Sequence, residues 1–455
     1  MINKMFCVII FGLLSPVFLQ AQDVEQSRLA TILYGTETEI AALVQSLRTE
    51  GADYLDDELI TLVDTTRNQR ILSGVFSFFG DREKSGLEER AIRVIEERDD
   101  EANETVHSAI DYIGKVKASD AVGALMELLD SGERRFMNGA FRALGRVGIA
   151  DAETADDVAE YLIDYYSYRD PGDDNRREVI TSIGATGSSR GVSLLVELVS
   201  DNDERIPLRI AALDALSKIG DPDGLEAILG CINSNDPNVR SAAVGALGPF
   251  SGEDVDNAIL DAFRDSYYRT RIAACHASRD RRLAIAVPYL QFRAERDDVP
   301  NVKDEAIRAL GAIANEEALA AIDVFFTQRR NSDRVRLVSA EMLMKNSGGV
   351  YFPRLAAELD DARQRNQTAL YNGFLKIAGE TIIAGREEQA SSIMLNVTRR
   401  FLQTGGIMEK LYGLDMAANN DLKELAEEII TLTKERNESL ARRAQRTAER
   451  LGIEL

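Results

Sequence analysis

The residues best suited to catalysis are few in this chain of 455 residues, and they do not form a catalytic set. The chain has two histidines, His107 and His276, and three cysteines. Cys275 and His276 are adjacent, so on a helix their side chains point about 100° apart, which is poor geometry for a nucleophile and its base. His107 lies far away along the chain. We therefore expect no catalytic site, no metal site and no cofactor.

Two kinds of loop motif resemble binding sites only in part. The stretch "GATGSSR" at 184–190 has the glycines of a phosphate-binding loop. It lacks the Gly-Lys-Ser/Thr ending, however, and it follows a predicted helix instead of a strand. Acidic turns such as "DPGDD" at 170–174 could attract Ca²⁺ in an exported protein, yet none matches an EF-hand loop. Helix caps and solvated turns are the default interpretation, and the sequence leaves calcium binding open.

Two tyrosine clusters are candidates for partner binding, "YLIDYYSY" at 161–168 and "SYYR" at 266–269. Tyrosine is enriched at protein interfaces, where its ring supplies a large contact area. The tyrosines that we select as candidates are Tyr165, Tyr166, Tyr168, Tyr267 and Tyr268. An equal alternative for the first cluster is a helical stripe that packs against the core.

An internal repeat positions all of these residues, and its cleanest copy is "DPNVRSAAVGALG" at 236–248. We take Ala246 in this copy as the reference position. The equivalent residues of all ten copies are Val75, Ala109, Ala143, Ser182, Ala215, Ala246, Ala277, Ala309, Met342 and Phe374. Their spacing lies between 31 and 39 residues. Self-similarity at such a period is typical of arrays in which each repeat is one small supersecondary unit.

Each repeat is predicted to hold two helices. In the reference copy, apolar residues at i, i+3, i+4, i+7 and i+8 from Val239 form one apolar helix face. Asp236 is a suitable N-cap, Pro237 fits the first helical turn, and Gly248 stands where a C-terminal cap is expected. First helices are predicted at 120–130, 190–200 and 315–326, among others. No stretch shows a convincing strand pattern.

These units predict an all-α fold, because a two-helix unit of about 33 residues cannot close a core alone and must stack on its neighbours. We expect a right-handed α-solenoid (α-α superhelix) of about ten to twelve two-helix repeats. The pattern Asp-Pro-x-Val-Arg-x-x-Ala-x-x-Ala-Leu-Gly, preceded by a Leu-rich helix, resembles the HEAT repeat in its short bacterial form, as in phycobilisome lyases. The resemblance covers about residues 65–380 and implies an architecture more than a function.

A cation stands six positions before the reference residue in six consecutive repeats. These residues are Arg176, Arg209, Arg240, Arg271, Lys303 and Arg336, and each has acidic residues a few positions upstream. A basic stripe could bind an anionic ligand. A carboxylate that holds an arginine in a bidentate pair largely neutralises it, however. We therefore interpret the six cations as a structural ladder between adjacent repeats.

The first 21 residues differ from the rest of the chain. Lys4 precedes a mostly apolar run that ends in "LQA" at 19–21, which is the layout of a signal peptide cleaved after Ala21. The run is too short to span a bilayer comfortably, so we expect a periplasmic or secreted protein without an integral membrane span, and an uncleaved anchor is the alternative. We divide the rest into N-terminal capping helices at 22–64, a HEAT-like repeat array at 65–380, and divergent repeats or a cap at 381–455.

The charge balance narrows the class of partner. The chain carries 54 basic and 76 acidic residues, for a net charge of −22, which argues against binding nucleic acid. We expect an exported, non-enzymatic scaffold that binds proteins on the concave face lined by second helices, where Asn238 and Ser241 would face the partner. The alternatives are a cell-envelope structural component and an enzyme of the HEAT-like lyase type, although export argues against the chromophore attachment that a lyase would perform.

Overall fold

The computed structural model describes residues 16–169, 171–383 and 388–455. These residues form 25 α-helices and five short 3-10 helices, and they contain no strand, so the all-α prediction is confirmed. The chain divides into two compact units, Met1–Ala227 and Ile228–Leu455. Helix α13 (Leu225–Cys231) lies across the division.

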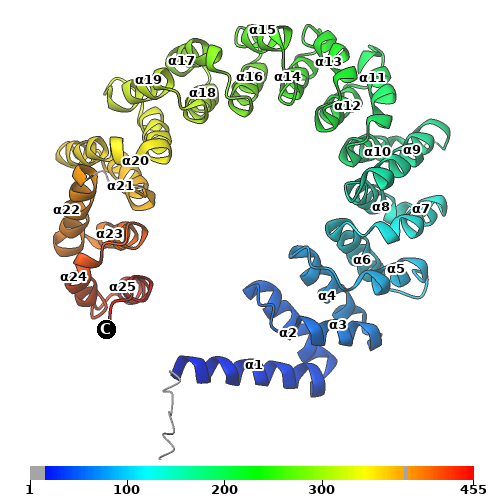
Figure 1. Ribbon diagram of the computed structural model, residues 1–455, viewed down its shortest axis with the longest axis horizontal. Coiled ribbons are helices and arrows are strands. Elements are labelled where there is room, and N and C mark those ends of the chain that lie inside the picture. The colour runs from blue at the N-terminus through cyan, green and yellow to red at the C-terminus, as the bar shows by residue number, and fades with distance from the viewer. Residues whose placement is uncertain (1–15, 170, 384–387) are drawn as a thin grey trace, which may run out of the picture. The chain divides into compact units, whose positions relative to one another are not determined.

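In the first unit the helices alternate between two rows (Figure 1). The first helices are α1 (Pro16–Tyr34), α3 (Asp56–Thr65), α5 (Glu88–Glu96), α7 (Val122–Asp130), α9 (Ala152–Tyr168) and α11 (Val192–Ser200). The second helices are α2 (Glu37–Glu50), α4 (Gln69–Asp81), α6 (Asn103–Val116), α8 (Arg134–Val147), α10 (Asp173–Thr186) and α12 (Ile206–Ile219). Each second helix packs on the second helix of the next repeat, and within this unit the second helices lie on the inner side of its bend.

The second unit repeats this arrangement (Figure 1). Its first helices are α15 (Glu253–Ala262), α17 (Val287–Arg296), α19 (Glu316–Thr327), α22 (Glu388–Thr404) and α24 (Ala426–Leu432). Its second helices are α14 (Pro237–Ala246), α16 (Tyr268–Asp280), α18 (Pro300–Ile313), α21 (Thr368–Glu380), α23 (Ile407–Asn419) and α25 (Glu438–Leu451). The long helix α20 (Asp333–Gln364) supplies one helix to each row, because its backbone departs from helical geometry at Ser347.

The core runs along the second helices, and the repeat's reference position lies inside it. All ten reference residues are buried, with no more than 8% of their surface exposed. Several contact a glycine of the preceding second helix. A Cβ atom added to Gly184 would lie 2.5 Å from the Ala215 Cα, and one added to Gly145 would lie 2.9 Å from the Ser182 Cα. The small residues of the motif therefore permit neighbouring second helices to approach closely.

The predicted helix signals agree with the structure in most places. The first helices expected at 120–130, 190–200 and 315–326 correspond to α7, α11 and α19, the first two preceded by a 3-10 turn. Asp236 caps α14 by accepting hydrogen bonds from the Asn238 and Val239 amides. The expectation for Gly248 was wrong in detail: α14 ends at Ala246, and Gly248 does not adopt the left-handed conformation that Gly187 and Gly220 use to end α10 and α12.

Three features of the array were not foreseen. The 39-residue spacing is accommodated by α9, which has 17 residues where the neighbouring α7 and α11 have 9 each. No loop separates the two halves of α20. With those halves taken as separate helices, the described residues contain thirteen consecutive helix pairs, against the ten to twelve expected. The three pairs beyond the ten counted copies are α1–α2, α22–α23 and α24–α25, at the two ends of the chain.

The expected signal peptide falls largely outside the described residues. Residues 1–15 are not described, and 16–21 form the beginning of α1. Among the helices that the structure describes, none combines the length and apolar character needed to cross a membrane. Cleavage after Ala21 and the boundaries at 64 and 380 stay predictions.

Candidate protein-interaction site

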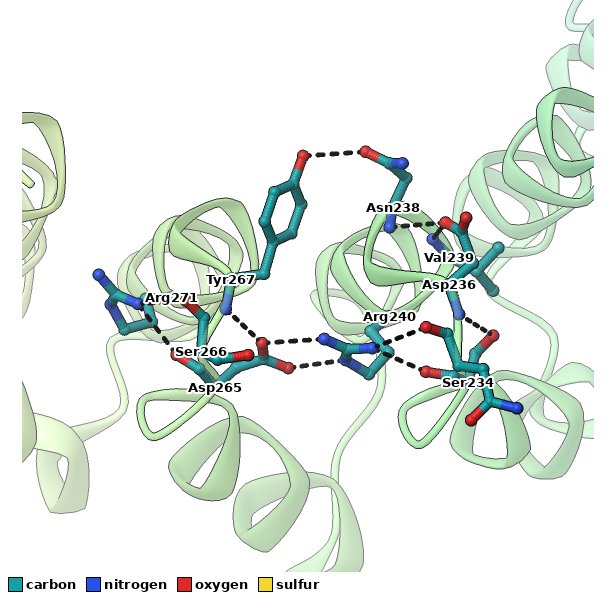
Figure 2. Close-up of polar contacts among 10 residues, drawn as sticks. Ser234, Asp236, Asn238, Val239, Arg240, Asp265, Ser266, Tyr267 and Arg271 are labelled. Atoms are coloured by element: carbon teal, nitrogen blue, oxygen red, sulfur yellow. Dashed lines mark hydrogen bonds and ion pairs between the residues drawn. The ribbon is translucent and has the colours of Figure 1, made fainter.

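The side chain of Arg240 connects two neighbouring repeats of the second unit (Figure 2). Its Nε and Nη2 atoms donate to the two carboxylate oxygens of Asp265 at 2.8 and 3.1 Å, which is a bidentate pair. Its Nη1 atom donates to the Ser234 carbonyl at 2.8 Å. Ser234 follows the first helix of Arg240's own repeat, whereas Asp265 belongs to the next repeat. One guanidinium therefore satisfies a carbonyl at a helix end and joins adjacent repeats.

Four of the other five ladder cations also donate to a carbonyl at the end of a first helix. Arg271 donates to the Asp265 carbonyl at 3.0 Å and pairs with Asp297 of the next repeat at 2.8 Å. The remaining contacts are as follows: Arg336 donates to the Phe326 carbonyl and pairs with Glu358, Arg209 donates to the Val199 carbonyl, Lys303 donates to the Glu295 carbonyl, and Arg176 lies over the Tyr166 ring. Cations are favourable beside the unpaired carbonyls at a helix C-terminus.

Two of the acidic residues upstream of the ladder cations, Asp265 and Asp297, each accept hydrogen bonds from an arginine and from a backbone amide. Asp265 accepts from Arg240 and, at 2.7 Å, from the amide of Tyr267, the residue directly before α16. Burial raises the pKa of the Asp265 carboxyl, but these hydrogen bonds outweigh burial and the pKa lies below its usual value. Asp297 has the same environment, with Arg271 and the Val299 amide as donors, and its pKa is also lowered. Asp265 and Asp297 thus bind the cation of the preceding repeat and also hold the turn that leads into their own second helix.

Asn238, Tyr267 and Tyr268 come together at the N-terminal ends of α14 and α16. The Tyr267 hydroxyl donates to the Asn238 side-chain oxygen at 3.0 Å (Figure 2). The ring of Tyr268 packs edge-on against Tyr267 with 5.4 Å between centroids, and Arg269 donates to the Tyr268 hydroxyl at 3.2 Å. All three are half-buried, and so is Ser241, one turn further along α14. These four candidates form one partly exposed surface, which we call the tyrosine surface.

The candidates on α9 do not form such a surface. Tyr165 and Tyr166 are 6% and 8% exposed, and Tyr165 packs edge-on against Phe141 while its hydroxyl donates to the Leu129 carbonyl. Neither is accessible to a partner, because the stripe they form on α9 packs into the core. Tyr168, at the end of the helix, is 83% exposed and is the only one of these three that a partner could reach.

Cys231, Cys275 and His276, which are residues with catalytic potential, are buried or bound to a neighbouring helix. Cys231 and Cys275 are buried, and burial raises the pKa of the Cys275 thiol. His276 Nε2 lies 3.0 Å from a Glu305 carboxylate oxygen on the neighbouring helix α18. Within the described residues, no three His, Cys, Asp or Glu side chains cluster in a way that could hold a metal ion.

A further group of aromatic residues, which lines a groove, was missed at the sequence level. Phe263, Tyr289 and Phe292 line a groove between the end of α15 and the helix α17. Phe292 is 51% exposed. The signal is present in "VPYLQFRAER" at 287–296, where aromatic residues share a helix face with arginines. Helical periodicity alone assigns such residues to the core, so their exposure becomes visible only in the structure.

Comparison with known proteins identifies the repeat type. A family model described as Spirochaete HEAT repeat protein matches residues 32–447. No curated protein matches the chain. Crystal structures of Kap121p alone, bound to Nup53p and bound to Pho4p are similar at 13%, 14% and 13% identity, with TM-scores of 0.44, 0.44 and 0.45. Each similarity covers 97% of this chain and 52% of the other, so the chain spans about half the length of these structures.

Proposed function

The chain belongs to the Spirochaete HEAT repeat protein family, and on this premise we propose that it is an exported, non-enzymatic scaffold that binds protein partners on its second helices. The tyrosine surface carries the proposal. It combines aromatic rings with hydroxyl and amide groups, which is the composition that recurs at protein interfaces. Its residues lie on or directly before α14 and α16, and these two second helices lie on the inner side of the second unit's bend.

The distribution of charge supports a surface of this kind. The bidentate pairs of Arg240 and Arg271 engage their guanidinium groups with carboxylates of the protein itself. The net charge of −22 further disfavours polyanionic partners. A protein partner that contacts rings and uncharged polar groups needs no free guanidinium group and is not repelled by the net negative charge.

The environment of Cys275 and His276 supports a non-enzymatic role. The thiol is fully buried with a raised pKa, so little thiolate forms at neutral pH. The His276 ring meets Glu305 and not the thiol. The two residues therefore lack the arrangement by which a base activates a nucleophile.

Substitutions on α14 test the binding surface. Ser241→Arg adds a long charged side chain to the tyrosine surface without entering the core. We expect it to reduce the yield of the protein partners crosslinked to the chain in cells by about tenfold or more, with an unchanged melting temperature. The matched control is Asn257→Arg on the exposed side of α15, which should keep the partners. Equal capture by both variants would contradict the proposed surface.

Export is tested separately, by mass spectrometry of the mature chain and by cell fractionation. A chain that begins at Gln22 and occurs in the periplasm or the medium is expected. An intact N-terminus in the membrane fraction would indicate the uncleaved anchor instead. An intact chain in the cytosol would contradict export.

A further inference from the structure

An aromatic groove on the first helices of the second unit is built differently from the tyrosine surface. Its lining residues are Phe263, Arg264, Pro288, Tyr289, Phe292 and Arg293, and its volume is about 370 Å³. Phe263 forms the floor, since it is 1% exposed and stacks on Tyr289 with 5.8 Å between ring centroids. Pro288 and Phe292 form exposed walls on α17. The groove thus offers apolar surface to an inserted side chain.

Arginines cover the ring faces at the rim of this groove. The guanidinium carbon of Arg264 lies 5.5 Å from the Tyr289 ring centroid, and those of Arg293 and Arg296 lie 5.2 and 5.8 Å from the Phe292 centroid. These are cation–π distances, so the rings hold the arginines in place. The aromatic groove is therefore a basic site on a chain whose net charge is −22.

Two of these arginines are available to a ligand. Arg264 pairs with Asp261 at 2.9 Å within one helical turn, and the two side chains are 65% and 76% exposed. Arg296 lies 4.0 Å from Glu295, and its side chain is 67% exposed. Ion pairs this exposed contribute little and exchange readily with an incoming carboxylate. The ladder arginines differ, because Arg271 is 7% exposed and its partner Asp297 is fully buried.

A polar pocket adjoins the aromatic groove at Arg264, which lines both. It has a volume of about 540 Å³, and the loop of Asn233, Ser234 and Asn235 forms part of its wall. Side-chain amides and hydroxyls can hydrogen-bond an extended peptide backbone. Apolar surface, positive charge and hydrogen-bonding groups therefore follow one another across α15 and the loops beside it.

We propose that the aromatic groove binds an acidic peptide segment of a partner protein. One aromatic or large aliphatic side chain of the peptide enters between Phe292 and Tyr289, and flanking carboxylates pair with Arg264 and Arg296. The polar pocket receives the peptide backbone beyond Arg264. A proline-rich segment fits less well, because proline supplies no carboxylate to pair with Arg264 and Arg296. The aromatic groove lies on first helices, so it is a second binding site beyond the tyrosine surface.

Selection of random displayed peptides on the full-length chain tests this assignment. We expect enriched peptides to carry Asp or Glu beside Phe, Tyr, Trp or Leu. A synthetic, fluorescently labelled copy of the most enriched peptide should bind about tenfold more weakly, or worse, to Arg264→Gln and to Phe292→Ala, and binding should weaken as salt is raised.

Matched variants make the outcome decisive. Arg442→Gln removes an equally exposed arginine from α25, and Val350→Ala trims an exposed apolar side chain on α20. Both should bind the peptide like the wild type, and so should Ser241→Arg, which disturbs only the tyrosine surface. Enrichment of basic or proline-rich peptides, no enrichment at all, or binding unaffected by Arg264→Gln and Phe292→Ala in folded protein would overturn the proposal. If Ser241→Arg lost the peptide while Arg264→Gln still bound it, the peptide would bind at the tyrosine surface. That result would contradict a site at the aromatic groove but would be consistent with the proposed function.

Discussion

Arg240 shows how one residue can serve both its own repeat and the next. Its bonds to the Ser234 carbonyl and to Asp265 use both edges of the guanidinium. Lysine could supply the charge but not the planar fork that meets two carboxylate oxygens. Lys303 illustrates the difference, because its described hydrogen bond goes to the Glu295 carbonyl alone. The bond to a carbonyl at a helix end therefore recurs with either cation, and Arg240, Arg271 and Arg336 add a pair with a carboxylate of the next repeat.

Replacing Arg240 by alanine should lower stability. The change leaves Asp265, whose side chain is 13% exposed, without its bidentate partner, and it leaves the Ser234 carbonyl without that donor. We expect a loss of about 1–3 kcal/mol in the free energy of unfolding, measured by urea denaturation. Arg442→Ala is the control, because its pair with Glu438 is exposed and should be worth less than about 0.5 kcal/mol. If Arg240→Ala were as stable as the control, the structural role inferred for Arg240 would be contradicted.

The contribution of the Arg240–Asp265 pair should also depend on pH. The pKa of Asp265 in the folded chain lies below its usual value of 3.8, so the folded state favours the carboxylate. The stabilisation is fully present above the unfolded pKa and is lost as pH falls through the folded pKa. The destabilisation caused by Arg240→Ala should therefore be constant from pH 7 to 5 and shrink below about pH 4. Lys303→Ala, which breaks a bond to a carbonyl, should show no such change, and parallel pH curves for the two variants would contradict this account.

At the scale of the helices, close approach along the second row is the main constraint. Gly184 of α10 meets the backbone of α12 at Ala215, and Gly145 of α8 meets Ser182 of α10. Side chains at these positions would push the helices apart, and well-packed interiors resist such changes. The first row is less constrained, since α9 is longer than its neighbours while α8, α10 and α12 still pack on one another.

Gly184→Ala should destabilise the chain although alanine is the better helix former. The added Cβ would lie 2.5 Å from the Ala215 Cα, so the backbone must move. We expect a loss of about 1–3 kcal/mol, measured by urea denaturation followed by circular dichroism. The matched change is Gly139→Ala in the middle of α8, where the nearest atom outside its own helix would lie at an ordinary 3.5 Å. That variant should gain up to about 1 kcal/mol from helix propensity, and a gain at both positions would show that the approach at Gly184 is not tight.

At the scale of the whole molecule, stability is expected to be local. Helices contact chiefly their own repeat and its immediate neighbours within each compact unit. Arrays of this kind gain stability repeat by repeat, and they do not depend on a single central core. The two units can then differ in stability without either unfolding the other.

Hydrogen exchange measured by mass spectrometry can detect this locality. In Gly184→Ala, amide exchange should accelerate in α8, α10 and α12, because these helices meet at or beside the substituted position. Exchange in α23 and α25, which belong to the other unit, should match the wild type. Uniform acceleration across all helices would instead indicate one cooperative unit.

The sequence by itself determined the class of fold and the repeat. The reference position of all ten copies is buried as the periodicity predicted, because apolar residues at helical spacing have to leave water wherever the helices pack. The Asp236 cap was readable for a similar reason, since an N-cap is a contact within one turn. Local rules of this kind need no knowledge of the neighbouring repeat.

The tertiary structure decided what each side chain meets. It placed Tyr165 in the core and Tyr168 in solvent, although both lie in the same short cluster. It also gave Arg240 its partner in the next repeat and left Phe292 exposed beside Tyr289. These outcomes depend on which residues of another repeat face a given position, and that is set by how the helices stack. Periodicity predicts that a helix has an apolar side and a polar side. Only the packed array shows which residues remain accessible to water and to partners.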